Sequence, residues 1–354
     1  MPNFSGVWDL RQQGVAVQGD TWQKPATEGR AIFTGGSTSG YLSHAASLTV
    51  LDFVEINTLS NASDFGDLST GSSFNGCMSS STRGVIQLGG DTAASFNADA
   101  ATDTIEYVTI ASEGNSSNFG DASQLRYNGI FSASNATRGL NGGGYVGTYS
   151  KQIDYITIAT QGDGQDFGDL SVERWGPGGL GSSTRSICLG GISFDQNTER
   201  GSNHIDYKAI ASLGDFVDFG DLNELRRGMS AASNSTRGIV SGSMPASEAV
   251  DSIEYITIAT LGNGTDFGDL ANGQSGTKGY LTSPSNMGCG AAGESRAVLV
   301  RGNDGSSTYG NETSDIEYIT IATLSNGRDF GDLTVARQAF MGQSIASNHG
   351  GLQT

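Results

Sequence analysis

Two charged residues recur in this chain about once every fifty residues. The tripeptide Phe-Gly-Asp occurs six times and supplies Asp67, Asp121, Asp169, Asp221, Asp269 and Asp332. A Thr-Arg-Gly-type turn in each repeat supplies Arg30, Arg83, Arg138, Arg185, Arg237 and Arg296. A charged residue that recurs in every repeat has the same structural role in each one, whereas a catalytic site needs a combination of residues that occurs once. We therefore expect charge-assisted hydrogen bonds within or between repeats, with the aspartates accepting from backbone N–H groups or from an arginine.

Residues suited to catalysis or to metal binding are few. The histidines lie far apart in the chain, at His44, His204 and His349. The cysteines have no C-x-x-C spacing and lie at Cys77, Cys188 and Cys289, which favours buried free thiols. The alternative of calcium at acidic turns such as 163–166 lacks a loop of alternating oxygen ligands. We therefore expect no metal, no cofactor and no enzymatic activity.

The repeat itself predicts short β-strands. The Phe-Gly-Asp copies are spaced by 54, 48, 52, 48 and 63 residues, and an aliphatic residue always stands fourteen residues before the Phe. In the fifth copy, residues 253–260 are rich in β-branched and aromatic residues and are apolar on both faces, so both faces must be covered. With a small-residue strand, an aliphatic strand ending in glycines and the Phe-Gly-Asp strand, each repeat contains four strands. Six such repeats predict an all-β fold, a six-bladed β-propeller with four-stranded blades.

Loop lengths vary at only two connections, and both emerge on the same face of such a fold. The distance from the repeat arginine to the third strand ranges from 15 to 22 residues, and an insertion near residues 272–284 lengthens one connection between repeats. Variable loops on a rigid scaffold are where binding sites are usually built, although loops also drift when nothing constrains their length. The binding candidates on this face are Tyr41, His44, Phe96, Tyr145, Tyr149, Phe194, Tyr280 and Tyr309.

The order of an Arg-containing segment, an aliphatic strand ending in Gly-Gly, a strand with a spaced Tyr and an aromatic residue before Leu resembles the kelch repeat over residues 29–347. The match departs from the kelch pattern in the fourth strand, where Phe replaces Trp in all six copies. The sequence Ile-Asp/Glu-Tyr-Ile-Thr-Ile-Ala-Thr before Asp-Phe-Gly-Asp-Leu is similar to repeat proteins of tailed, marine-type phages. The opening Gly-Val-Trp-Asp-Leu-Arg-Gln-Gln is similar to the N-termini of phage virion proteins such as tail fibres.

Residues 29–354 are expected to form the propeller. After the last Phe-Gly-Asp, residues 333–348 resemble the first strand of a repeat, so we expect this segment to complete the first blade; the alternative closing strand is Val15–Val17. Residues 1–28 then remain outside the ring with Trp8 and Trp22, and we expect them to be an anchor for another virion protein.

Composition excludes several other classes. The net charge of −18 excludes a nucleic-acid binder, and no apolar run is long enough for membrane insertion. No signal peptide opens the sequence, so we expect synthesis in the host cytoplasm and incorporation into the virion. The resemblance implies a phage tail fibre, spike or capsid-surface adhesin, present in multiple copies, that recognises a host-surface glycan or protein. The alternatives are an intracellular kelch-type interaction scaffold and, less favoured because no copper cluster is evident, a galactose-oxidase-like enzyme.

Overall fold

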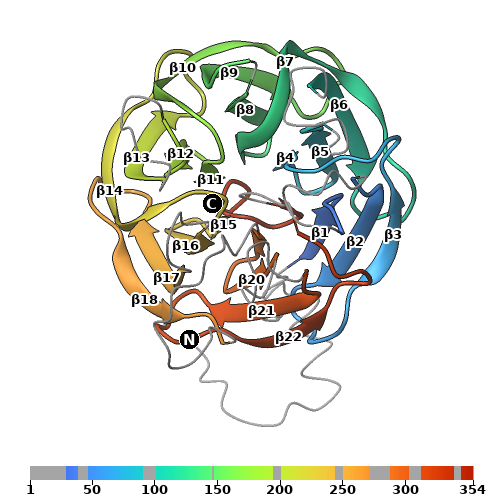
Figure 1. Cartoon of the computed structure of the whole chain (residues 1–354), viewed down its shortest axis with the longest axis vertical. Helices are drawn as coiled ribbons and strands as arrows, with labels where there is room; N and C mark the ends of the chain where they lie inside the picture. The colour runs from blue at the N-terminus through green and yellow to red at the C-terminus, as the bar shows by residue number, and fades with distance from the viewer. Residues whose placement is uncertain are drawn as a thin grey trace, which may run out of the picture.

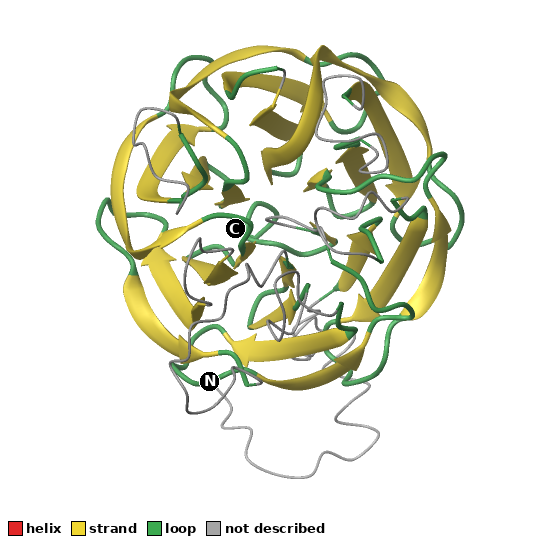
Figure 2. Ribbon diagram, in the orientation of Figure 1, coloured by secondary structure: helices red, strands yellow, loops and turns green. Residues whose placement is uncertain are grey.

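The computed structural model describes residues 29–38, 47–90, 101–145, 147–193, 201–243, 250–271, 288–302, 312–338 and 344–353. Every regular element in these ranges is a β-strand, as Figure 2 shows, and the expected all-β class is confirmed. Several expected functional residues lie outside the described ranges: the anchor segment 1–28 with Trp8 and Trp22, and the loop residues Tyr41, His44, Phe96, Phe194, Tyr280 and Tyr309.

The strands form antiparallel sheets in which chain neighbours pair, except that the last strand joins the first sheet. That sheet has the order β23-β1-β2-β3 and contains β1 (Arg30–Thr34), β2 (Val50–Glu55), β3 (Ser63–Asp67) and β23 (Ile345–Ala346). A seven-stranded sheet contains β4 (Gly76–Ser79), β5 (Arg83–Gln87), β6 (Thr102–Thr109), β7 (Ser117–Ser134), β8 (Arg138–Tyr145), β9 (Ser150–Thr157) and β10 (Gln165–Arg174).

Three four-stranded sheets complete the described fold. They contain β11 (Gly178–Gly181), β12 (Arg185–Leu189), β13 (Ser202–Ala209) and β14 (Val217–Arg226); β15 (Ser230–Ser233), β16 (Arg237–Ser243), β17 (Val250–Thr257) and β18 (Thr265–Asp269); and β19 (Cys289–Ala292), β20 (Arg296–Val300), β21 (Asp315–Thr320) and β22 (Arg328–Asp332). The seven-stranded sheet divides at β7, which pairs with β6 up to Arg126 and with β8 from Tyr127 onwards. The strands thus form one four-stranded unit per sequence repeat, and we number these units 1 to 6 in chain order.

Figure 1 shows the units side by side around a common centre, with the first strand of each unit innermost and the fourth strand at the rim. This arrangement is compatible with a β-propeller. Unit 1 takes its innermost strand from the C-terminal part of the chain, because β23 pairs with β1 through Ala31–Ala346 and Ile32–Ile345. The expected pairing of the C-terminal segment with the first unit is confirmed, and the alternative strand at Val15–Val17 lies outside the described residues.

Apolar side chains on both faces of the sheets form the core. One cluster joins Ile253 and Phe267 of unit 5 to Leu299 of unit 6, and another joins units 6 and 1 through residues such as Phe330 and Val54. Each sheet therefore packs face to face on its neighbour, which explains why the third strands are apolar on both sides.

The Phe of every Phe-Gly-Asp copy is the extra residue of a β-bulge. In unit 5, Ile253 pairs with Gly268 and Glu254 pairs with Asp266, so Phe267 between them has no partner. The same register shift occurs in the other five units. The bulged Phe267 ring is buried and packs edge-to-face on Tyr255 with centroids 6.2 Å apart. A bulge bends the strand and redirects its backbone, which accounts for the strictness of this tripeptide.

Residues 347–353, after β23, lie at the centre of the ring and contact units on different sides of it (Figure 1). His349 donates from Nε2 to the carbonyl oxygen of Ser79 in unit 2 at 2.9 Å, and Gly350 donates its N–H to Ser233 in unit 5 at 2.8 Å. Burial lowers the pKa of His349 to about 4, against the opposing effect of its hydrogen bond to Ser79. The imidazole is therefore neutral near pH 7.

Candidate functional site

Alternate connections of each unit emerge on opposite faces of the ring, because neighbouring strands are antiparallel. We call one face the short-turn face: it carries the turns between the first and second strands and between the third and fourth strands. The other is the loop face, which carries the variable connections. The two faces present different kinds of residue, and they are described in turn.

On the short-turn face, the repeat arginines tie each unit to the next. Each guanidinium lies over an aromatic ring of the third strand of its own unit, as Arg237 lies 4.5 Å from the Tyr255 centroid. Each also donates from Nη1 to the carbonyl oxygen of an isoleucine in the following unit at 2.8–3.1 Å: Arg30 to Ile110, Arg83 to Ile158, Arg138 to Ile210, Arg185 to Ile258, Arg237 to Ile321, and Arg296 to Ile56. These are charge-assisted hydrogen bonds between units, and the sixth contact, from Arg296, returns to unit 1.

The Phe-Gly-Asp aspartates also bind the next unit, and they do so through backbone groups. The backbone N–H of each donates to a side-chain oxygen at 3.0–3.2 Å, in the pairs Asp67–Asn115, Asp121–Asp163, Asp169–Asp215, Asp221–Asn263, Asp269–Asn326 and Asp332–Asn61. Their carbonyl oxygens accept N–H groups of the same turns at 2.7–2.9 Å. The fourth strand is the edge of its sheet, so its backbone groups need partners from outside that sheet. The carboxylate of Asp67, for example, accepts from Thr49 of its own unit.

The glycine of the tripeptide permits this close contact. Gly331 has a φ of +148°, and a Cβ at this position would lie 2.4 Å from the carbonyl oxygen of Ser60 in unit 1. Only glycine fits both the backbone conformation and the space.

A ring of buried carboxylates, which the sequence analysis did not identify, lies beneath these contacts. Each stands directly after the residue that opens the third-strand pattern, and each accepts a backbone N–H from the preceding unit at 2.7–3.3 Å: Asp52 from Thr334, Glu106 from Ser69, Asp154 from Ser123, Asp206 from Ser171, Glu254 from Asn223, and Glu317 from Ala271. All six are at most 2% exposed. The available signal was an acidic residue at one fixed place in an otherwise apolar strand.

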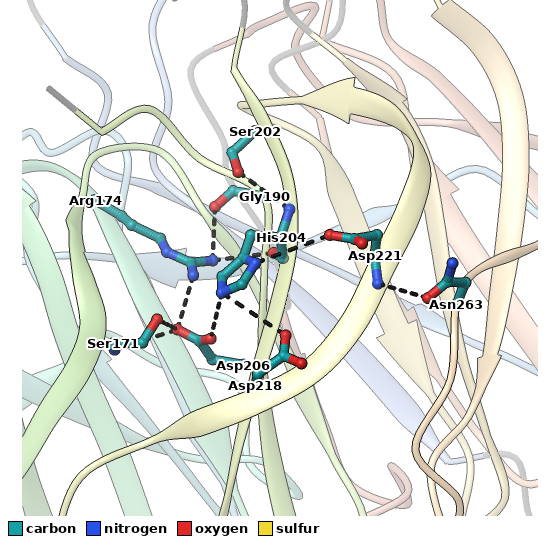
Figure 3. Close-up of polar contacts among 9 residues, drawn as sticks. All are labelled: Ser171, Arg174, Gly190, Ser202, His204, Asp206, Asp218, Asp221 and Asn263. Atoms are coloured by element: carbon teal, nitrogen blue, oxygen red, sulfur yellow. Dashed lines mark hydrogen bonds and ion pairs between the residues drawn. The ribbon is translucent and has the colours of Figure 1, made fainter. Parts of the chain in front are cut away.

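Four of these carboxylates are paired with buried arginines that stand seven residues after the Phe of Phe-Gly-Asp. The pairs are Arg126–Asp154, Arg174–Asp206, Arg226–Glu254 and Arg337–Asp52, with N–O distances of 2.7–3.1 Å. Figure 3 shows one of them: Arg174 binds Asp206 and also donates to the carbonyl oxygens of Gly190 and His204. Burial lowers the pKa of Arg126 and of Arg337, while the adjacent carboxylates Asp154 and Asp52 oppose the change.

The carboxylate of unit 2 is held without an arginine. The position that would supply the arginine is Ser72, and Glu106 instead accepts from the N–H and hydroxyl of Ser69 and from the hydroxyl of Ser116. Neutral donors can therefore hold a buried carboxylate in this fold. All six carboxylates accept a backbone N–H, and four of them bind an arginine as well.

His204 in unit 4 is the one histidine that contacts several carboxylates among the described residues. Its Nε2 lies 3.2 Å from Asp206 and 3.9 Å from Asp218, and its Nδ1 lies 3.9 Å from Asp221 (Figure 3). Within the described ranges, no group of three or more His, Cys, Asp and Glu residues has an arrangement that could hold a metal ion. The cysteines in these ranges are buried free thiols, as expected.

On the loop face, the structure brings together two of the expected binding residues. Tyr145 at the end of β8 and Tyr149 before β9 pair through their backbones and pack edge-to-face with ring centroids 6.2 Å apart. Both side chains are partly buried against Phe74, Trp175 and Ile192. We call these five residues the aromatic cluster. Phe74 and Trp175 come from connections between units, and the sequence analysis did not select them.

The base of the aromatic cluster is held in a strained backbone conformation. Phe74 has a φ of +58°, which is unusual for a residue other than glycine, and its side chain is only 1% exposed. The neighbouring residues hold it there: Ser73 donates its N–H to Gly90 at 3.2 Å, and Asn75 accepts the N–H of Gly89 at 3.0 Å. Such strain persists where the surrounding contacts over-determine it, and it concentrates at functional sites.

A cation borders the aromatic cluster. Arg227 directly follows the buried Arg226, is itself half-buried, and lies with its guanidinium 5.8 Å from the Trp175 ring centroid. Aromatic surface and a hydrogen-bond donor thus meet on the loop face.

No protein-family model matches the sequence, and no curated protein sequence matches it significantly. In the described part of the chain, no helix has the length and apolar character needed to cross a bilayer.

Proposed function

We propose that the chain forms a six-bladed kelch-like β-propeller over residues 29–354, in which each four-stranded unit is one blade and β23 closes the ring. Support comes from the contacts between units 6 and 1. Arg296 donates to Ile56, Asp332 to Asn61 and Thr334 to Asp52, and each of these contacts repeats one that joins the other successive units. A closed ring also covers the apolar faces of units 6 and 1, which pack on each other through residues such as Phe330 and Val54.

The protein is, in this proposal, a structural protein of a phage virion, namely a tail fibre, spike or capsid-surface adhesin, and its loop face recognises a host-surface glycan or protein. The observation that carries the recognition role is the aromatic cluster, which gathers Tyr145, Tyr149 and Trp175 where other units have side chains of other types, such as Ser37 and Gln338. The assignment to a virion rests on the resemblance of the repeats and of the N-terminal sequence to phage proteins.

Binding is proposed in preference to catalysis. The recurrent arginines and the buried carboxylates serve the contacts between units, so these charged groups are already engaged. We expect no cofactor and no metal requirement, and metal analysis of the purified protein tests this expectation.

Residues 1–28 are proposed to anchor the protein to another virion protein. Gly29, where the described chain begins, accepts the N–H of Ile56, and Ile56 follows the third strand of unit 1. Gly29 therefore lies on the short-turn face, and attachment on this side of the molecule would leave the loop face free for a host surface.

Mass spectrometry of purified particles and immunogold microscopy test the virion assignment. We expect the protein in particles, in several copies, with its epitopes on the outer surface. Absence from particles, with abundant protein in infected cells, would favour the intracellular scaffold. Deletion of residues 1–28 should leave a folded protein that fails to join particles, whereas an unfolded product would refute the anchor.

A further inference from the structure

We propose that the aromatic cluster on the loop face binds a neutral pyranose ring of a host-surface glycan. This inference rests on the proposed recognition function of the loop face and narrows its ligand to one chemical class. It assigns direct contact to Tyr145 and Tyr149, a supporting role to Phe74, Trp175 and Ile192, and a polar contact to Arg227.

The arrangement of the cluster suits a sugar. One face of a pyranose ring presents C–H groups that pack on aromatic rings, while its hydroxyl groups require hydrogen-bonding partners at the edge of the site. Tyr145 and Tyr149 meet at an interplanar angle of 70°, so together they form a corner. Their rings combine apolar faces with phenolic hydroxyls that can bind sugar hydroxyls, and tyrosine loses little conformational entropy on binding.

The buried base makes this corner rigid. Trp175 and Ile192 exchange backbone hydrogen bonds of 2.9 and 2.8 Å, which join the end of β10 to the end of β12 in the next unit. Phe74 reaches the same cluster from the connection between units 1 and 2. A site whose supporting residues are held by three connections is preorganised, which reduces the entropic cost of binding.

The cluster differs from the other aromatic groups of the protein. Tyr255 and its equivalents in the third strands lie beneath the repeat arginines, in contacts that hold the fold. The cluster residues lie where strands end on the loop face, and within the described ranges no second group has the same combination. A feature that occurs once in a repetitive fold is not required by the repeat.

The charge of the chain favours a neutral sugar. At a net charge of −18, the protein repels anionic polysaccharides at long range. Arg227 supplies donors beside Trp175 that can bind hydroxyl oxygens without requiring an acidic group on the ligand.

Binding of the purified full-length protein to immobilised polysaccharides tests the inference. The probes are the neutral dextran, mannan and galactan and the acidic alginate and hyaluronate. We expect binding to at least one neutral probe and a loss of affinity of about tenfold or more in Tyr145→Ala and in Tyr149→Ala. Tyr149→Phe keeps the ring and should stay within about threefold of the wild type. Leu261→Ala is the control, because Leu261 is 56% exposed on the short-turn face.

Three results would overturn the proposal: binding to acidic probes alone, no binding to any neutral probe, or equal binding by the wild type and both alanine variants. Unchanged thermal unfolding of the variants shows that a lost affinity is not caused by lost folding.

Attachment of labelled protein to host cells distinguishes a failure of the sugar site from a failure of host recognition. The sugar site is refuted, and host recognition stays intact, if attachment persists in two tests. One test is periodate oxidation of the cell-surface sugars, and the other is the Tyr149→Ala change. No attachment, with Tyr149-dependent binding to a neutral probe, would refute host recognition and leave the sugar site intact.

Discussion

The two faces of the ring follow opposite rules. On the short-turn face, one set of contacts is made by every unit: the repeat arginine to an isoleucine carbonyl, the Phe-Gly-Asp backbone to the next turn, and a backbone N–H to a buried carboxylate. On the loop face, the described residues form one aromatic cluster, and its side chains differ in type from those at the matching positions of other units, as Trp175 differs from Gln338. The contacts that recur in every unit hold the ring together. The aromatic cluster does not follow this repeat, which makes it the candidate binding site.

The largest expected effect comes from breaking a buried ion pair between units. Arg226 binds Glu254 through both Nε and Nη2, at 3.0 and 2.7 Å, with both side chains buried. Arg226→Met should lower the free energy of unfolding by about 3–5 kcal/mol, because it leaves an uncompensated buried carboxylate. Denaturant unfolding measures the change.

The double variant Arg226→Met with Glu254→Leu is its control. This variant removes both charges, so it should recover a large part of the loss. If Arg226→Met alone unfolds like the wild type, Glu254 does not need its arginine. It would then resemble Glu106, which is held by Ser69 and Ser116 without an arginine.

Acid should weaken the central C-terminal segment. The pKa of His349 is lowered by burial to about 4, so below its unfolded pKa near 6.5 the unfolded chain binds more protons than the folded one. Stability supplied by the neutral imidazole is complete above about pH 6.5, and it is lost as the pH falls to about 4, by on the order of 3 kcal/mol. Unfolding measured across this range should show a smaller decline in His349→Gln. Equal declines in the two proteins would contradict this role for His349.

Replacing a Phe-Gly-Asp glycine should weaken the contact between units 6 and 1. Gly331→Ala places a Cβ against the Ser60 carbonyl oxygen at a φ of +148°, and we expect a loss of about 2 kcal/mol. The matched control is Gly162→Ala. Gly162 has a φ of +156°, but a Cβ there would meet no atom within 4 Å, so this variant isolates backbone strain from steric conflict. Equal losses in the two variants would show that the close approach of the units contributes nothing.

The smallest effect is expected for an aspartate that the sequence made prominent. Asp269 contacts the next unit through its backbone, and burial together with the nearby Asp251 and Asp266 raises the pKa of its carboxyl group. Asp269→Asn keeps the backbone contact and relieves like-charge repulsion. Its thermal unfolding should therefore match or slightly exceed that of the wild type, within about 0.5 kcal/mol. A clear loss of stability would show that the Asp269 carboxylate itself stabilises the fold.

Much of the fold was predictable because it is local and repeated. The spacing from Ile253 to Phe267 is the same in all six copies and indicated the third and fourth strands, and the tail around Ile345 indicated the strand that completes unit 1. The role of the repeat arginines was also foreseen. The role of Asp269 was not, because the repeated tripeptide does not reveal that the backbone at a sheet edge, and not the exposed carboxylate, makes the contact.

The sequence by itself determined the strand order, the period and the separation of strict turns from variable loops, because these depend on residues close together in the chain. Only the tertiary structure decided that Glu254 faces Arg226, and that Trp175 and Phe74 meet Tyr145 and Tyr149. These partners come from different strands or different units. These contacts depend on how successive sheets stack around a common centre. The spacing of residues within one repeat does not predict that stacking.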